Sequence, residues 1–177
     1  AFAAAGYKVF GDDVLALTAE GLGQGLGIAP RLRLPLPAGL AAEMVSFVQQ
    51  YTGPADTRYS YLVPPAGNLA HHGETRPLGA VVLLARDAGI TTPQLSRLAP
   101  GDGLLQLLCQ NFAHDAPSEL LVERLLPLME DTPCLLLHYS EPLAAVEAVQ
   151  AALREPSLLA VPCARDEEPA SAPSPRC

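Results

Sequence analysis

The sequence predicts an α/β domain, because short apolar runs typical of strands alternate along the chain with segments of helical periodicity. Two continuous apolar runs, residues 78–85 and 134–139, have the length of strands that are buried on both faces. Segments with apolar residues at helical spacing precede, separate and follow them. The length of 177 residues suits a single domain with a sizeable core.

The first half of the chain is predicted to begin at the end of a helix. Residues 1–5 are rich in Ala and are closed by Gly6, which suits the position just past a helix C-terminus. Four strands are expected in this half, at residues 7–11, 14–18, 31–34 and 59–63. Residues 21–27 carry four glycines and are expected to form a loop or hairpin. One helix is expected at residues 40–51, ended by Thr52-Gly53-Pro54, and a long polar loop at residues 64–77.

The second half is predicted to contain the larger strands and helices. Strands are expected at residues 78–85, 94–98 and 134–139, and helices at residues 100–113, 117–129 and 141–153. Ser140 is the expected N-cap of the last helix. Beyond residue 154 the periodicity ends, so we expect a folded domain over residues 1–155 and a disordered Pro/Ser/Ala-rich tail over residues 156–177.

Net charge, hydropathy and cysteine spacing argue against several function classes. The net charge is −8, which argues against electrostatic binding to nucleic acid or to anionic lipid. No apolar run approaches the roughly 20 residues that a membrane-spanning helix needs. The four cysteines lie far apart and form no C-x-x-C pair, which favours a reduced, cytoplasmic setting.

The pair Asp12-Asp13 is the strongest candidate for a functional site. Adjacent carboxylates at the end of a strand can hold Mg²⁺ beside a phosphate or take a proton from an attacking hydroxyl. Two like charges side by side also require a nearby cation, either a metal ion or a basic side chain, and Lys8 lies too early on the strand to provide it. The alternative is a surface turn, because Gly-Asp-Asp is also good turn chemistry.

The stretch 3–18 (AAAGYKVFGDDVLALT) resembles the second strand and acidic turn of the HPr kinase/phosphorylase family and its relatives. The order of the later segments is similar too: residues 30–35, 76–84, 104–113 and 135–153 resemble the following strand, the central buried strand, a helix, and the closing strand and helix. The resemblance covers residues 1–153, and only the acidic turn is chemically specific. It implies a mixed sheet flanked by helices, in the P-loop kinase fold of bacterial phosphoenolpyruvate carboxykinase.

The resemblance also implies an activity and its cofactors. The protein would be an ATP-dependent phosphotransferase that uses Mg²⁺, with a protein serine or a small molecule as the acceptor. Asp12 would act as the base or orienting group for the acceptor hydroxyl, and Asp13 would assist through Mg²⁺. Neither nucleic acid nor a membrane would be a partner, and homo-oligomerisation stays open.

The sequence departs from that family at the phosphate-binding elements. No G-x-x-x-x-G-K-[ST] loop occurs, so the chain is expected to be a C-terminal fragment, incomplete at its N-terminus, whose ATP-contacting residues lie elsewhere. The family's E-I-R-G-L-G-I signature is matched only by Gly25-Leu26-Gly27-Ile28. The alternative function is therefore a non-catalytic α/β interaction module that has lost the nucleotide site.

Overall fold

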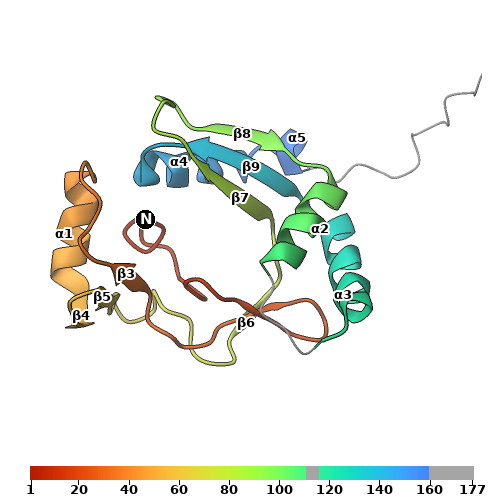
Figure 1. Cartoon of the computed structure of the whole chain (residues 1–177), viewed down its shortest axis with the longest axis horizontal. Coiled ribbons are helices and arrows are strands. Elements are labelled where there is room, and N and C mark those ends of the chain that lie inside the picture. The colour runs from red at the N-terminus through yellow and green to blue at the C-terminus, as the bar shows by residue number, and fades with distance from the viewer. Residues whose placement is uncertain (111–115, 160–177) are drawn as a thin grey trace, which may run out of the picture.

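The chain folds as a mixed α/β structure, as the sequence predicts. The computed structural model describes residues 1–110 and 116–159. In these residues there are three small sheets of three strands each and four helices of ten or more residues. In Figure 1 one sheet runs along the top, α2 and α3 lie at one end, and α1 lies with a second sheet at the other end.

Two antiparallel sheets are built from the first 76 residues. One has the strand order β1-β2-β6, with bounds Ala16–Leu17, Gly23–Gln24 and Thr75–Arg76. The other has the order β3-β5-β4, with bounds Arg31–Arg33, Tyr59–Leu62 and Thr52–Ala55. Helix α1 (Ala42–Tyr51) connects β3 to β4 and buries Met44 and Val48. These strands are two to four residues long, so each sheet contributes little packed surface of its own.

The third sheet is mixed and has the order β7-β9-β8. Its strands are β7 (Val81–Arg86), β8 (Gln94–Arg97) and β9 (Cys134–Tyr139). The central strand β9 runs parallel to β7 and antiparallel to β8. Helices α2 (Pro100–Cys109) and α3 (Ser118–Asp131) connect β8 to β9, and α4 (Pro142–Ala152) and the short α5 (Pro156–Leu159) follow.

The best-packed part of the core lies between β9 and α4. Leu137, Ala145 and Val149 form a buried cluster against Val82, Leu95, Tyr139 and Ala148. At the other end of β9, Gly103 allows α2 to approach closely, because a Cβ there would lie 2.6 Å from the Cys134 sulfur. Burial raises the pKa of the Cys134 thiol, as expected for a core cysteine.

The structure corrects several expected elements. Residues 7–11 do not form a strand, since only Val9 makes a single bridge, to Leu69. Residues 52–54 do not simply end the helix but begin β4, which pairs with β5. Glu141 caps α4 in place of Ser140, since its carboxylate accepts from the Ala144 N–H at 2.7 Å.

The prediction that residues 78–85 are buried on both faces is also wrong. The side chain of Leu84 is 65% exposed, and β7 lies at an edge of its sheet. Of the expected tail, residues 156–159 form α5, and the remainder lies outside the described residues. Across the described ranges, no helix combines the length and the apolar character needed to cross a membrane.

Candidate functional site: the Asp12–Asp13 loop

A single helical turn at the N-terminus sets the start of the segment that leads to the acidic pair. The N–H of Tyr7 donates to the Phe2 carbonyl and the N–H of Gly6 to the Ala3 carbonyl, while Gly6 has φ +85°. This is the hydrogen-bond pattern of a glycine-ended helix, and Phe2 meets Tyr7 edge to face at 5.7 Å. Gly6 therefore ends a single turn with this hydrogen-bond pattern, whereas the expected helix over residues 1–5 is not formed.

The segment between Gly6 and the acidic pair is held by residues 68–70. The N–H of Val9 donates to Asn68 at 2.8 Å, and the N–H of Ala70 donates back to Val9 at 2.8 Å. Gly11 then begins a tight turn, since a Cβ on this residue would collide with the Val14 carbonyl. Asp12 and Asp13 thus lie in a loop whose shape depends on a glycine.

Asp12 is oriented by a hydrogen bond to the backbone of the neighbouring sheet. Its Oδ2 atom accepts from the N–H of Arg31 at 2.9 Å, at the first residue of β3. This bond joins the acidic loop to the sheet β3-β5-β4. The hydrogen bond from Arg31 engages Oδ2 of Asp12. Because both oxygens belong to one planar carboxylate, the same bond also orients Oδ1.

Asp13 lies beside the side chain of the same arginine. The guanidinium Nη2 of Arg31 is 3.7 Å from Asp13 Oδ2, and the Asp13 side chain is 70% exposed. The expectation that a cation accompanies the two carboxylates is thus met by Arg31. At this distance and exposure, the ion pair itself contributes little to stability.

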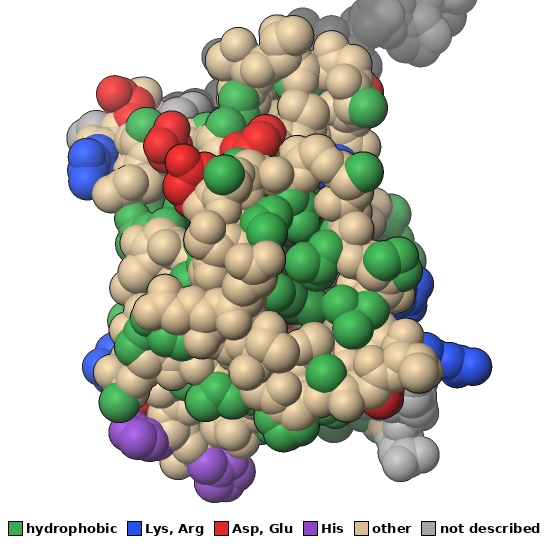
Figure 2. All heavy atoms as spheres, turned by 90° about the vertical axis from the view of Figure 1, so that its left-hand side faces the viewer, with side chains coloured by type: hydrophobic (Ala, Val, Ile, Leu, Met, Phe, Trp, Pro, Cys, Tyr) green, Lys and Arg blue, Asp and Glu red, His purple; other side chains and the backbone are tan. Residues whose placement is uncertain are grey.

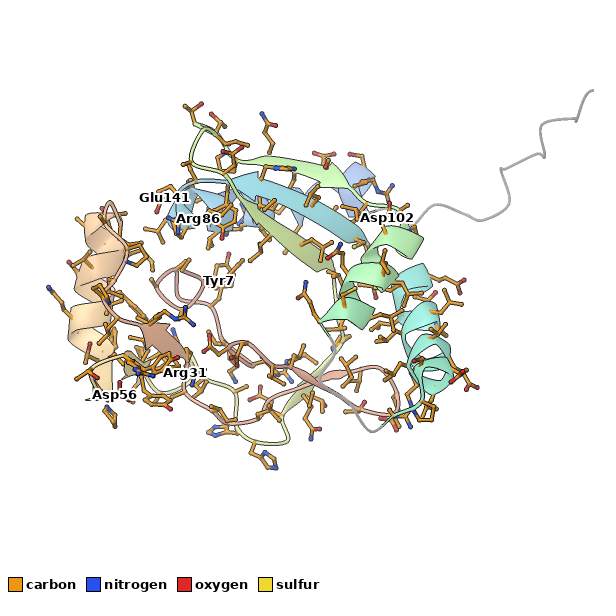
Figure 3. All side chains as sticks on the ribbon, in the orientation of Figure 1. Tyr7, Arg31, Asp56, Arg86, Asp102 and Glu141 are labelled. Atoms are coloured by element: carbon orange, nitrogen blue, oxygen red, sulfur yellow. The ribbon has the colours of Figure 1, made fainter. Side chains whose placement is uncertain are left out.

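Arg31 is in turn positioned by β5 and by the turn before it. Its guanidinium carbon lies 4.5 Å from the centre of the Tyr59 ring, in a cation–π arrangement. Asp56 lies in the same region of the molecule (Figure 3). Its carboxylate accepts from the N–H groups of Arg58 and Tyr59, which hold the pKa of Asp56 below its usual value, with a smaller contribution from Arg31.

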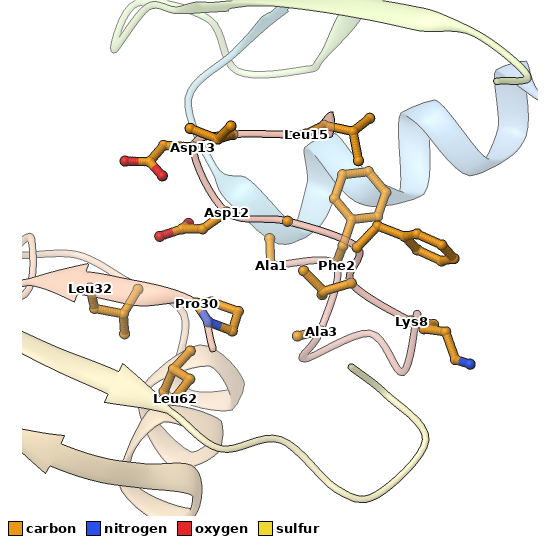
Figure 4. Close-up of a pocket in the computed structure, with 14 residues that line it drawn as sticks. Ala1, Phe2, Ala3, Lys8, Asp12, Asp13, Leu15, Pro30, Leu32 and Leu62 are labelled. Carbon is orange, nitrogen blue, oxygen red and sulfur yellow. The ribbon is translucent and has the colours of Figure 1, made fainter. Parts of the chain in front are cut away.

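The acidic pair lines a cavity of about 550 Å³ between the N-terminal segment and the sheet β3-β5-β4. The rest of its lining is mainly apolar and includes Pro30, Leu32 and Leu62. In Figure 4 the carboxylates of Asp12 and Asp13 point to the same side of the loop, whereas the amine of Lys8 points the opposite way. Two carboxylates at the rim of a largely apolar cavity are an arrangement that suits a small-molecule or side-chain ligand.

Lys8 has a different partner from the acidic pair. Its Nζ atom lies 2.9 and 3.1 Å from the two carboxylate oxygens of Glu74, which also pairs with Arg76 at 3.2 Å. The hydrogen bond from Lys8 is the main reason why the pKa of Glu74 lies below its usual value. As expected from its early position on the segment, Lys8 does not serve Asp12 and Asp13.

The glycines of the 25–28 segment have a packing role. A Cβ on Gly25 would lie 2.8 Å from both the Ala70 Cβ and the His71 carbonyl oxygen. The backbone of Gly25 also exchanges hydrogen bonds with Glu74 and Gly73. The segment that resembles the family signature therefore packs against residues 70–74.

The donor set at the loop suits Mg²⁺ only in part. Mg²⁺ in kinase sites takes one or two carboxylates together with substrate phosphates and water, and Asp12 and Asp13 provide such carboxylates. Arg31, however, already lies beside Asp13. In the described part of the chain, no three His, Cys, Asp or Glu side chains come together as a metal site, and His71 and His72 are exposed.

Among the described residues, those that line this cavity do not provide a site for the phosphates of ATP. The sequence has no Walker-type loop, and the cavity is lined by residues 1–3, 8–15, 30, 32 and 62, none of which opens a described helix of eight or more residues. Backbone N–H groups at a helix N-terminus are the usual phosphate cradle. A nucleotide at this cavity would need its phosphates held by residues other than those that line it.

Sequence reasoning identified the carboxylates but did not identify their supports. The turn at Gly11 matches the Gly-Asp-Asp turn that the sequence offers as an alternative. The contact of Arg31 with Asp13 depends on tertiary structure that no local pattern encodes. Tyr59 and Asp56 carried no signal that linked them to residues 12 and 13.

Comparisons of this chain with protein families, with curated proteins and with solved structures found no match.

Proposed function

We propose that the Asp12–Asp13 loop is the acceptor side of the active site in an ATP-dependent, HPr kinase-related phosphotransferase. The observation that carries this proposal is the geometry of the pair: adjacent carboxylates on the same side of one loop, at the rim of a cavity of about 550 Å³, with one cation beside them. The domain would belong to the P-loop kinase fold, with the nucleotide phosphates held by residues other than those that line this cavity.

Each carboxylate has a distinct role in this proposal. Asp12, fixed through Oδ2 by the Arg31 N–H, uses Oδ1 to accept a hydrogen bond from the acceptor hydroxyl and to take its proton. Asp13 is the residue that would hold Mg²⁺, and the ion, when bound, would supply charge neutralisation at a phosphoryl group. Arg31 keeps the two negative charges compatible when no metal is bound. The acceptor, a protein serine or a small molecule, would enter through the cavity.

The test uses two substitutions of Asp12 in the protein encoded by the complete open reading frame. Asp12→Asn keeps an oxygen that accepts from the Arg31 N–H but removes the charge, whereas Asp12→Ala removes both. We expect both variants to lower kcat by about 10²-fold or more, the usual scale for loss of a general base. Only Asp12→Ala should also lower stability, by about 1 kcal/mol for the lost hydrogen bond.

The matched control is Glu123→Gln, which neutralises an exposed carboxylate on α3 and should leave kcat unchanged. Full activity in Asp12→Asn would contradict the proposal.

The second candidate is a non-catalytic interaction module, and one observation favours it. Asp12 and Asp13 both already contact Arg31, so the pair also serves to attach the loop to β3. In that case Asp12→Ala would lower stability, Asp12→Asn would change little, and no phosphoryl transfer would depend on either residue.

A further inference from the structure

The outer edge of β7 presents backbone groups without partners in the described structure. The N–H of Val81 donates to Pro133 and the N–H of Asp87 donates to Tyr139, both at 2.8 Å. In a parallel ladder, alternate residues face the same neighbour, so residues 81, 83 and 85 face β9. Val82, Leu84 and Arg86 therefore direct their N–H and C=O groups away from the sheet. Among residues 1–110 and 116–159, no backbone hydrogen bond joins these three groups to another segment.

The two edges of this sheet differ in chemistry. At the β8 edge the exposed residues are Gln94, Ser96 and Arg97, and such polar or charged edges normally prevent further strand pairing. The β7 edge has the sequence Val-Val-Leu-Leu-Ala before its first charged residue, Arg86. Its Leu84 side chain is 65% exposed, the largest exposed fraction among the exposed large hydrophobic residues of the described chain. The β7 edge thus lacks the polar and charged residues that protect the β8 edge against pairing with a further strand.

A groove of mixed character lies beside β7. It has a volume of about 360 Å³ and lies between the sheet and α2. Its apolar lining comes from Leu83, Leu84, Leu98, Leu105 and Leu136, and its polar lining from Asp102, Gln106 and Gln110. Leu105 is 58% exposed. The groove provides a site for side chains of a segment whose backbone pairs with β7.

Opposite charges mark the two ends of this site. Asp102 lines the groove, and the adjacent Gly103 packs against Cys134, which pairs with Val81. Asp102, on α2, therefore lies near the N-terminal end of β7. Arg86 ends β7, and Figure 3 shows Arg86 and Asp102 toward opposite ends of this strand. The chain's net charge of −8 disfavours a second copy of itself as the occupant.

We propose that the β7 edge binds an extended peptide segment as an additional, antiparallel strand. Antiparallel pairing is favoured because it is the more stable ladder. The segment carries apolar residues at alternate positions, an acidic residue near its N-terminal end to meet Arg86, and a basic residue near its C-terminal end to meet Asp102. This is recognition by strand addition, in which backbone hydrogen bonds provide affinity and the groove provides specificity. It does not depend on the phosphotransferase proposal.

The first experiment measures amide hydrogen exchange by NMR in the full 177-residue chain. In the free protein, the amides of Val82, Leu84 and Arg86 should exchange rapidly, whereas those of Leu83 and Ala85 should be protected by β9. Added acetyl-Glu-Val-Thr-Val-Thr-Val-Lys-amide should slow the exchange of the three outward amides by about tenfold or more at saturation. Protection of those amides in the free protein would show a covered edge and overturn the proposal.

The second experiment measures the affinity of the same peptide by isothermal titration calorimetry. Leu84→Lys places a charge on the exposed edge and should weaken binding at least about tenfold, as edge lysines do in natural sheets. The matched control is Ile28→Lys, since Ile28 is 56% exposed and lies in a loop outside the groove; it should change affinity less than about twofold. Asp102→Asn should weaken binding and reduce its dependence on salt.

Two further outcomes decide the identity of the occupant. Of two peptides N-methylated at one or the other set of alternate residues, the one whose methyl groups face β7 cannot pair as a strand and should not bind; equal binding of both peptides would overturn strand addition. Sedimentation equilibrium should show a monomer whose mass is unaffected by Leu84→Lys. A dimer abolished by Leu84→Lys would show that a second copy takes this edge and would overturn the peptide proposal.

Discussion

The N-terminal region, residues 1–76, and the C-terminal layer, residues 78–152, are stabilised in different ways. The C-terminal layer has two six-residue strands, β7 and β9, and contains the three largest fully buried side chains, Met129, Leu135 and Leu137. The N-terminal region has strands of two to four residues, which are joined by loop hydrogen bonds and by close-packed glycines. The acidic loop lies in the N-terminal region.

This difference matters for function, because functional loops are usually positioned by a rigid scaffold. Here the immediate supports of Asp12 and Asp13 are few and local: the Gly11 turn, the contacts to Arg31, and the attachment of Val9 to residues 68–70. Figure 2 views the side of the molecule that carries α1, where hydrophobic side chains gather in a central hollow with acidic side chains above it. We therefore expect substitutions near the acidic loop to affect the site more than global stability, and substitutions in the C-terminal layer to do the opposite.

The largest expected effect comes from removing core volume in the C-terminal layer. Leu137→Ala should lower the free energy of unfolding by about 4 kcal/mol, because Leu137 is 1% exposed and packs against α4. The paired substitution Leu62→Ala should cost only about 2 kcal/mol, because Leu62 lines an existing cavity beside the acidic loop. Urea denaturation measures both. Equal losses would contradict the difference between the two regions.

A smaller effect is expected from the turn glycine. Gly11→Ala should lower stability by about 1–3 kcal/mol, because the new Cβ would meet the Val14 carbonyl and force the loop to move. The NMR signal of the Arg31 amide, which donates to Asp12, should shift with it. Gly79→Ala is the matched control, since nothing lies within 4 Å of a Cβ there and φ is not positive. An unchanged Arg31 signal in Gly11→Ala would show that the loop does not depend on this glycine.

The smallest effect concerns Glu74, which attaches the Lys8 segment to residues 71–76. Its pKa in the folded protein lies below the ordinary value of 4.5, chiefly because of the hydrogen bond from Lys8. A depressed carboxyl pKa contributes stability that is present above pH 4.5 and is lost as pH falls through the folded pKa. Glu74→Gln should therefore be less stable than the wild type at pH 7, and the difference should shrink at pH 3. A difference of the same size at both pH values would assign the role of Glu74 to packing.

Local patterns predicted most of the C-terminal layer and less of the N-terminal region. The expected helix at residues 141–153 and strand at residues 134–139 correspond to α4 (Pro142–Ala152) and β9 (Cys134–Tyr139), since long periodic segments specify their own structure. Residues 7–11 looked like a strand, but their available partner is the 68–70 loop, which pairs only with Val9. The exposure of Leu84 was missed because an apolar run does not reveal whether a strand is central or at an edge.

In the candidate site too, some features can be predicted from local sequence and others depend on tertiary structure. The carboxylates and the turn glycine are adjacent in sequence, so their combination was visible in Gly11-Asp12-Asp13. The cation and the ring beneath it, Arg31 and Tyr59, are brought there by the pairing of β3 with β5, which depends on strand register. The cavity likewise arises from the packing of the N-terminal turn against that sheet.

The most direct test of the central claim, that Asp12 and Asp13 form one cation-binding acidic site, is paramagnetic broadening by Mn²⁺ in the NMR spectrum of the chain. Mn²⁺ prefers the same oxygen ligands as Mg²⁺. The account predicts that the amide signals of residues 11–14 and of Arg31 broaden first, that excess Mg²⁺ restores them, and that Asp13→Asn abolishes the effect while Glu123→Gln does not. Broadening confined to other acidic stretches, such as Asp166-Glu167-Glu168, or unchanged broadening in Asp13→Asn, would contradict it.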